Sequence, residues 1–300
     1  MDLLATLRLP LFFTLSGMLA VKWMTRPWRD LLISKVATLL WLYLLWQTIS
    51  VVIYMVVPNV STPGKTDFAE ILTAAATPLR PQGALWFIWA LAVFFIVSRA
   101  LWAIAPSWLI VTVAALVSTF CFAEVIALGN VGWDGVLENY VFFAAGSLYA
   151  GAVRAVGTRM SYPIAGALVV TWAAFVLLVP FWDAPVVNLV SRGLGLAAGI
   201  AVGVLLSRLV VLRRAGANTL YLYLPHYITL TILAFLASIL TLPSSATGWL
   251  PVALFVACLA ICIGIWAASR HVTFLQSAFQ LPSWLQKVLA SPAPNQKLRS

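Results

Sequence analysis

The chain has 300 residues, of which 63% are hydrophobic and 9% are charged, and its mean hydropathy is +1.02. A soluble domain carries charge on about a quarter of its residues, so this composition excludes a soluble globular protein and indicates a membrane protein. The net charge of +10 comes from basic residues in short gaps between apolar runs, which excludes nucleic acid as the partner and favours membrane lipids.

A helix needs roughly 20 apolar residues to cross a bilayer. With turn residues and charges as boundaries, the sequence predicts nine apolar segments at about 9–22, 36–57, 84–98, 107–128, 138–153, 162–182, 188–207, 218–240 and 249–268. The predicted fold class is therefore all-α, a polytopic helical membrane protein. Residues 1–272 form one membrane domain, and residues 273–300 form a cytoplasmic interfacial segment followed by a disordered tail.

The first segment overlaps the stretch LRLPLFFTLSG (7–17), which a proline interrupts. Arg8 stands at its external mouth, where it either snorkels to the interface or holds an anionic group in a cavity. Ser16 and Gly17 lie near the cytoplasmic end. Because glycine permits close approach and serine supplies a hydroxyl, this pair is either a helix-packing element or part of a cavity.

The connections between segments alternate in charge. Fourteen basic residues fall in the odd-numbered connections and the C-terminal tail, whereas the even-numbered connections hold Lys65, Arg80 and Arg192 beside Asp67, Glu70, Asp134, Glu138 and Asp183. The positive-inside rule then places the C-terminus in the cytoplasm of a multi-pass plasma-membrane protein. The longest external connection, 58–83, is either a plain loop or a cover over an external site.

Few side chains can hold a metal or act as an acid. Cys121, Cys258 and Cys262 lack histidine or carboxylate partners at ligand spacing, so no metal site is predicted. Glu124 is taken as the only carboxylate within a predicted segment, and a position that reaches water suits it better than a general-base role.

His226 lies about eight residues into the eighth segment, within GANTLYLYLPHYITL (216–230). Pro225 loosens the helix there and tyrosines surround the imidazole, so the histidine either lines a water-filled cavity and exchanges protons or bridges two helices by hydrogen bonds. His271, at the cytoplasmic end of the last segment, is interpreted as a solvated residue.

Arg26 and Arg29 lie in the cytoplasmic stretch VKWMTRPWRD beside two tryptophans. They either bind a phosphorylated cofactor through bidentate contacts or serve as orientation arginines next to an aromatic belt.

Four stretches in this order resemble the integral-membrane acyltransferases of the acyltransferase-3 type, in particular the sugar O-acetylase branch. LRLPLFFTLSG (7–17) is similar to the family's Pro-Leu-Phe-Phe-x-x-Ser-Gly segment, and RPWRDLLISKVATLLWLYLL (26–45) to the basic stretch and helix that follow. ALWFIWALAVFF (84–95), with Trp86, resembles its Leu-Trp-Phe helix. GANTLYLYLPHYI (216–228), with Tyr223 and His226, resembles its Gly-x-x-Ser/Thr-Leu-x-x-Tyr-x-x-His helix.

The resemblance implies ten spans, an acyl-CoA donor that binds from the cytoplasm, and transfer of an acetyl or other acyl group to a hydroxyl presented outside. The family's first helix, which supplies a basic residue and a histidine regarded as catalytic, has no counterpart in this chain. We expect either that the helix lies upstream of Met1 or that this is a truncated, inactive member.

The sequence therefore predicts an O-acyltransferase, most simply an O-acetyltransferase, that acts on a cell-envelope sugar, glycan or glycolipid. His226 is the catalytic candidate, since it is the intramembrane histidine of this chain. Arg8, Ser16, Gly17, Arg26, Arg29, Trp86 and Tyr223 are the candidates for substrate or donor binding. The alternative is a transporter or flippase of a lipid-linked or small substrate, in which broken helices and intramembrane polar residues form the path of the substrate. The sequence does not specify the acceptor or the oligomeric state.

Overall fold

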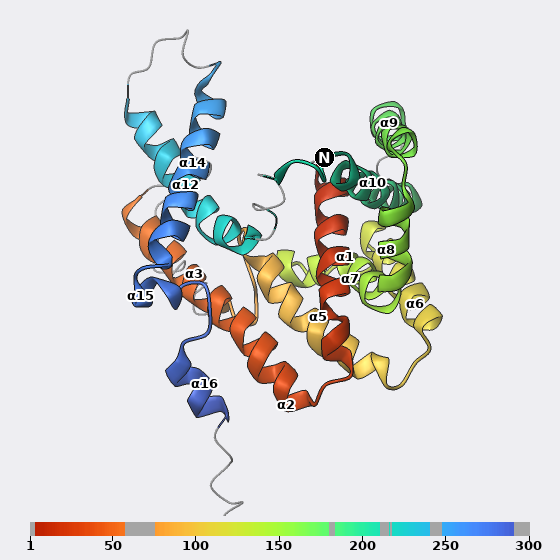
Figure 1. Ribbon diagram of the computed structural model, residues 1–300, viewed down its shortest axis with the longest axis horizontal. Coiled ribbons are helices and arrows are strands. Elements are labelled where there is room, and N and C mark those ends of the chain that lie inside the picture. Colours follow the sequence, from red (N-terminus) through yellow and green to blue (C-terminus); the bar gives the residue numbers. More distant parts are fainter. Residues whose placement is uncertain are drawn as a thin grey trace, which may run out of the picture. The chain divides into compact units, whose positions relative to one another are not determined.

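A computed structural model describes residues 4–57, 76–179, 184–210, 216, 218–240 and 248–290 (Figure 1). Within these ranges the regular structure consists of helices, with no strand. Most of the connection 58–83 and the tail after residue 290 lie outside the described residues. The chain divides into two compact units. Unit 1 contains Met1–Leu32 and Trp89–Gly216, and unit 2 contains Ile33–Ile88 and Ala217–Ser300.

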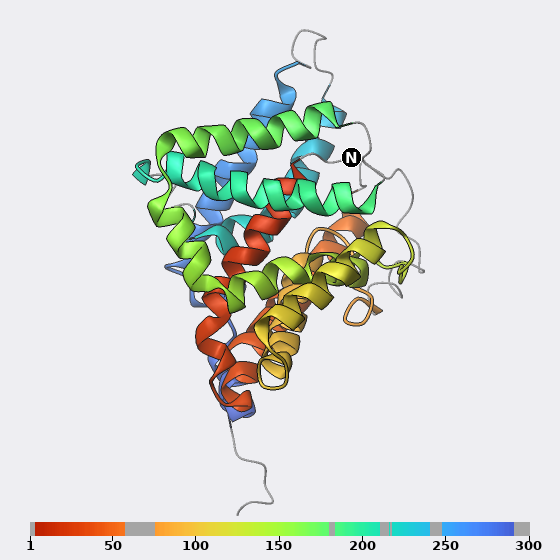
Figure 2. The same cartoon turned by 90° about the vertical axis from the view of Figure 1, so that its right-hand side faces the viewer.

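Unit 1 is built around a central helix, α1. Its helices are α1 (Ala5–Met24), α2 (Trp28–Leu31), most of α5 (Trp86–Trp102), α6 (Ser107–Phe122), α7 (Val131–Leu148), α8 (Ala150–Arg159), α9 (Tyr162–Leu178) and α10 (Pro185–Leu205). Helix α1 packs against both α7 and α10, α6 packs against α7 and α10, and α9 runs beside α10 (Figure 2). Helices α7 and α10 are thus the main neighbours of α1 among the described residues of this unit.

Unit 2 contains the helix that carries His226. Its elements are the π-helical turn η1 (Leu32–Val36), α3 (Ala37–Val56), the first turn of α5, α12 (Thr219–Ile239), α14 (Leu250–Ser269), α15 (Thr273–Gln276) and α16 (Ser283–Ala290). Helix α12 packs against α14 and also contacts α3 (Figure 1).

The polytopic helical class is confirmed. Each of the nine predicted segments coincides with a helix or a helix pair in the described part of the chain. Among the described residues, five helices are long and apolar enough to cross a membrane, with α2, η1 and α3 counted as one, and the α7–α8 pair would add a sixth. Helices α5, α6 and α9 are apolar but shorter, at 16–17 residues.

The fifth predicted segment, 138–153, is wrong as a single straight span. Helix α7 ends at Leu148, and α8 leaves at an angle of 80° after a break at Tyr149 (Figure 2). Helix α8 contains no buried residue and carries Arg154 and Arg159. Its residues lack the continuous apolar face that a span requires, so hydropathy alone merged two helices that run in different directions.

The proline in the first segment does not break the helix, because α1 continues through Pro10 to Met24. Pro10 lacks the N–H that would bond to the Thr6 carbonyl one turn earlier. Gly195 of α10 packs against that carbonyl so closely that an added Cβ would lie 2.2 Å from the Thr6 oxygen. A glycine of the neighbouring helix therefore packs where the proline has altered the regular bonding pattern.

Candidate functional site

His226 lies on the face of α12 that packs toward α14. Its Nδ1 is 2.5 Å from the backbone carbonyl oxygen of Tyr223, one turn earlier. A carbonyl oxygen can only accept, so this bond requires a proton on Nδ1 and leaves Nε2 of the neutral ring as a proton acceptor. Pro225 lies inside α12, yet the helix runs without interruption from Thr219 to Ile239. The contact thus holds the imidazole in the tautomer that a general base requires.

Tyr223 fastens this turn of α12 to the start of α5. Its hydroxyl donates to the carbonyl of Ala84, and its ring centre lies 5.7 Å from that of Phe87 and 5.3 Å from that of His226. Trp86, a predicted site residue, is the first residue of α5 and lies between these two contact points in the sequence. The structure therefore brings the turn that contains Trp86 beside Tyr223, which in turn contacts His226.

A groove of about 650 Å³ lies between α12 and α14, and its volume is within the range of ligand sites. Thr219, Tyr223 and His226 contribute the polar groups of its α12 wall. Cys258 and Cys262 line the α14 wall, and the Cys258 thiol is 3.4 Å from the His226 carbonyl oxygen. The rest of the lining is aliphatic or aromatic. His226 thus occupies an apolar cavity with a few polar groups close together.

A basic cluster lies where α1 and α5 end in unit 1. The Arg26 guanidinium lies 5.1 Å from the ring centre of Trp23, and the Arg26 carbonyl accepts from Arg99 Nε at 3.3 Å. Arg99 also lies 5.3 Å over the ring of Trp28. Arg29 is exposed two residues after Pro27. Arg26, Arg29 and Arg99 form what we name the basic cluster. Arg99 was missed as a candidate, although its position in the last turn of an apolar helix was a signal.

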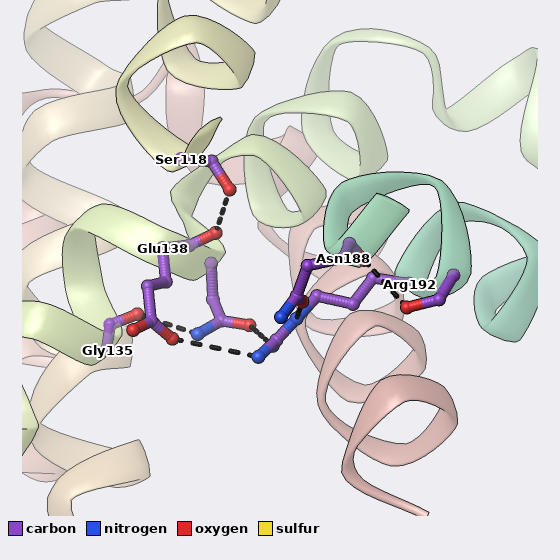
Figure 3. A network of polar contacts seen from close by, with 7 residues as sticks. Ser118, Gly135, Glu138, Asn188 and Arg192 are labelled. Atoms are coloured by element: carbon purple, nitrogen blue, oxygen red, sulfur yellow. Dashed lines mark hydrogen bonds and ion pairs between the residues drawn. The ribbon is translucent and has the colours of Figure 1, made fainter. Parts of the chain in front are cut away.

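A buried polar network joins α6, α7 and α10 in unit 1 (Figure 3). Arg192 Nη2 lies 3.8 Å from the Glu138 carboxylate, Nη1 donates to Asn139 Oδ1 at 3.2 Å, and Nε donates to Asn188 Oδ1 at 2.9 Å. Ser118 of α6 donates to the Glu138 backbone carbonyl at 2.7 Å. The network supplies hydrogen-bond acceptors to the guanidinium of Arg192, a residue that is 9% exposed. It also connects α10 to α7 through charged and amide groups.

The network corrects the predicted placement of two charged residues. Glu138 and Arg192 were counted as charges of external connections, but both lie inside helices, in α7 and α10. Glu124 lies in the turn after α6, with a φ of 56°, and not within the helix; its side chain is exposed, as expected for a position that reaches water. Arg192 stood inside the apolar segment 188–207, and that position was the signal for a buried role.

Gly17 packs closely against α7 in this structure, and Ser16 beside it is half-buried. Gly17 is buried, and a Cβ added to it would lie 2.2 Å from the Phe143 carbonyl oxygen of α7. Gly146 of α7 makes the reciprocal contact, since its added Cβ would lie 2.1 Å from the Thr14 carbonyl oxygen. Because these two residues have no side chain, the backbones of α1 and α7 can come into direct contact where the helices cross. Arg8 is exposed within the first turns of α1 rather than before the helix.

The candidate residues therefore fall in two groups. Trp86, Tyr223 and His226 belong to unit 2, whereas Arg8, Ser16, Gly17, Arg26 and Arg29 belong to unit 1. His271 is exposed after the end of α14. Among the described residues, no group of three or more histidine, cysteine or acidic side chains could hold a metal ion.

Comparison with known proteins identifies a family for this chain. The family profile described as "Acyltransferase domain", of the acyltransferase-3 type, matches residues 2–269. The match includes the basic cluster, the buried network and the groove, and it ends at the last residue of α14. No curated protein and no solved structure matches the chain.

Proposed function

Because this chain belongs to the acyltransferase-3 family and is a membrane acyltransferase, we propose that it is an O-acyltransferase of the cell envelope. It moves an acetyl or other acyl group from acyl-CoA on the cytoplasmic side of the plasma membrane to a hydroxyl of a sugar, glycan or glycolipid. The observation that carries the proposal is the orientation of His226, whose Nδ1 is fixed on the Tyr223 carbonyl while the ring lines the groove.

The chemistry requires one base that later serves as an acid. Nε2 of His226 accepts the proton of the acceptor hydroxyl as the oxygen attacks the thioester carbonyl carbon. The C–O bond forms, the C–S bond breaks, and the imidazolium returns the proton to the departing thiolate of CoA. The Nδ1 bond to the Tyr223 carbonyl stabilises the cationic ring, because that proton stays in place when Nε2 is protonated.

The donor carries several phosphates, which demand cationic partners. Within unit 1, Arg26, Arg29 and Arg99 form a group of cations that suits phosphates, and two of these guanidiniums lie over the indole rings of Trp23 and Trp28. Positive-inside charge alone explains basic residues at this end, but it does not explain why Arg26 and Arg99 are in contact.

The test uses the purified protein in lipid nanodiscs with acetyl-CoA and palmitoyl-CoA as donors and an extract of envelope glycolipids as the acceptor. We expect free CoA thiol to appear and the mass of one acyl group to be added to an extract component. The matched control is the same preparation without extract. A correctly folded protein that releases no thiol from either donor, with or without extract, would exclude the acyltransferase and favour the transporter alternative.

A further inference from the structure

The groove between α12 and α14 is long. Its lining runs along α12 from Thr219 to Ala234 and along α14 from Leu250 to Cys262. At about 1.5 Å per helical residue these stretches are roughly 22 Å and 18 Å long. The groove therefore covers more than half of a hydrocarbon layer about 30 Å thick. A cavity with these dimensions suits an extended chain better than a compact sugar ring.

The two ends of the groove differ in polarity. Thr219, Tyr223 and His226 mark the end where α12 begins. The other end is formed only by apolar side chains, namely Leu230, Ala234, Leu250, Pro251, Leu254 and Phe255. A sugar at this apolar end would leave its hydroxyls without hydrogen bonds, which costs free energy for each unpaired group. A hydrocarbon chain has no such cost there.

The direction in which the polarity of the groove decreases matches the arrangement of an acyl-CoA in a membrane. Helix α12 follows the connection that contains Arg208, Arg213 and Arg214, so the positive-inside rule predicts its polar end on the cytoplasmic side. An acyl-CoA also has its polar part in the cytoplasm. Its thioester lies where the polar part meets the acyl chain, and His226 lies where the polar lining meets the apolar lining.

We propose that this groove binds the hydrocarbon chain of a long-chain acyl-CoA, with the thioester beside His226 and the chain end between Ala234 and Leu250. The inference rests on the proposed function and makes it more specific, because an acetyl group would fill only a small part of a volume of about 650 Å³. The enzyme is thus a long-chain acyltransferase rather than an acetyltransferase.

The kinetic test compares donors of different chain length. We expect kcat/KM for palmitoyl-CoA to exceed that for acetyl-CoA at least tenfold. Ala234→Trp fills the apolar end and should reduce this ratio at least tenfold. The control is Ile239→Trp, which places the same side chain near the end of α12 at a residue that is 62% exposed and does not line the groove. Equal rates for the two donors, or an unchanged ratio in Ala234→Trp, would overturn the inference.

A binding test separates this inference from the proposed function. Palmitoyl-CoA with a photoreactive diazirine near the chain end should label peptides that contain Ala234 or Leu250–Phe255, and excess palmitoyl-CoA should suppress the labelling while acetyl-CoA should not. This result would support the groove assignment even in a protein that transfers no acyl group. Labelling spread over the exposed apolar helices, or crosslinks between two copies of the chain across the groove, would show that bulk lipid or a second copy occupies it.

Discussion

The side chain of Arg192 lies between a carboxylate and an aromatic ring. Its Nη2 is 3.8 Å from Glu138, and its guanidinium carbon is 4.5 Å from the ring centre of Phe122. Burying a charged group costs several kcal/mol, and Asn139 and Asn188 offset part of this cost by accepting hydrogen bonds from further donors of the guanidinium. These contacts join α6, α7 and α10, which are three of the helices of unit 1.

This geometry predicts a non-additive effect on stability. Arg192→Met leaves the Glu138 carboxylate without its cation, and Glu138→Leu leaves the guanidinium without its anion. Each single change should lower the free energy of unfolding by about 3–5 kcal/mol. The double variant should be more stable than the sum of the two changes predicts, since no unpaired charge remains. Denaturant titration of the four proteins in one detergent measures the coupling, and additive losses would show that the pair contributes nothing.

The crossing of α1 and α7 gives a second prediction. Gly17→Ala and Gly146→Ala each add a Cβ that would lie within 2.2 Å of a backbone carbonyl oxygen, so the two helices must move apart. We expect each variant to have a lower midpoint of thermal unfolding and a lower yield of folded protein.

The control for this pair is Gly166→Ala in α9, where an added Cβ meets no atom within 4 Å. Alanine is the better helix former, so Gly166→Ala should be neutral or slightly stabilising. If Gly17→Ala proved as stable as Gly166→Ala, Gly17 would not be required for helix packing, and a role in a cavity would become the better interpretation.

The two histidines of the chain provide a matched pair for the chemistry. His226→Ala removes the proposed base and should lower the rate of CoA release by about 10²–10⁴-fold, the usual contribution of general acid–base catalysis. His271→Ala changes an exposed histidine at the end of α14 and should retain the wild-type rate. The melting midpoint of both variants shows whether the fold is kept. Full activity in a folded His226→Ala protein would remove His226 from the catalytic site.

The sequence predicts the helices of this protein well because the signal is local. A span needs a run of apolar residues, and such a run can be recognised without knowledge of its neighbours, so 218–240 and 249–268 nearly coincide with α12 and α14. The bend at Tyr149 was missed because α7 and α8 follow each other without a polar gap long enough to mark a turn.

Charge counting misplaced two residues because the relevant contact is not local. The positive-inside rule treats each charge as a loop residue, so it assigned Glu138 and Arg192 to connections, although the two are partners across α7 and α10. Asn139, which completes the pairing, is 53 residues from Arg192 in the chain. No periodicity in one sequence identifies such a contact. The contact between Arg99 and Arg26 is of the same kind, since only the fold brings together the ends of α1 and α5.

The basic cluster gives a prediction about donor binding. Arg99→Gln removes a cation that contacts both Arg26 and Trp28, so it should raise KM for acyl-CoA about tenfold and change kcat little. Arg154→Gln, an exposed arginine in α8 that also lies in a connection predicted to be cytoplasmic, is the control. If both variants had the same KM as the wild type, the cluster would serve only to orient the protein in the membrane.

The segment after the last span gives the final prediction. Phe279 follows the residues matched by the family profile, yet it is only 4% exposed, and its ring lies 5.7 Å from that of Trp46 and 4.6 Å from that of Tyr221. Trp41 and Trp46 also donate from their indole nitrogens to the carbonyls of Ser277 and Ala278, at 2.8 Å and 2.6 Å. The segment is therefore fastened to α3 and to the first turn of α12 within unit 2.

Phe279→Ala should lower the free energy of unfolding by about 3–5 kcal/mol, the usual loss for a buried phenylalanine, and should expose residues 273–290 to limited proteolysis. Phe274→Ala is the matched control, because that phenylalanine is 82% exposed and belongs to the same segment. Tyr221 lies five residues before His226, so loosening this contact should also reduce the rate of CoA release. Equal proteolysis of the two variants would show that the segment lies on the membrane surface without contributing to the stability of unit 2.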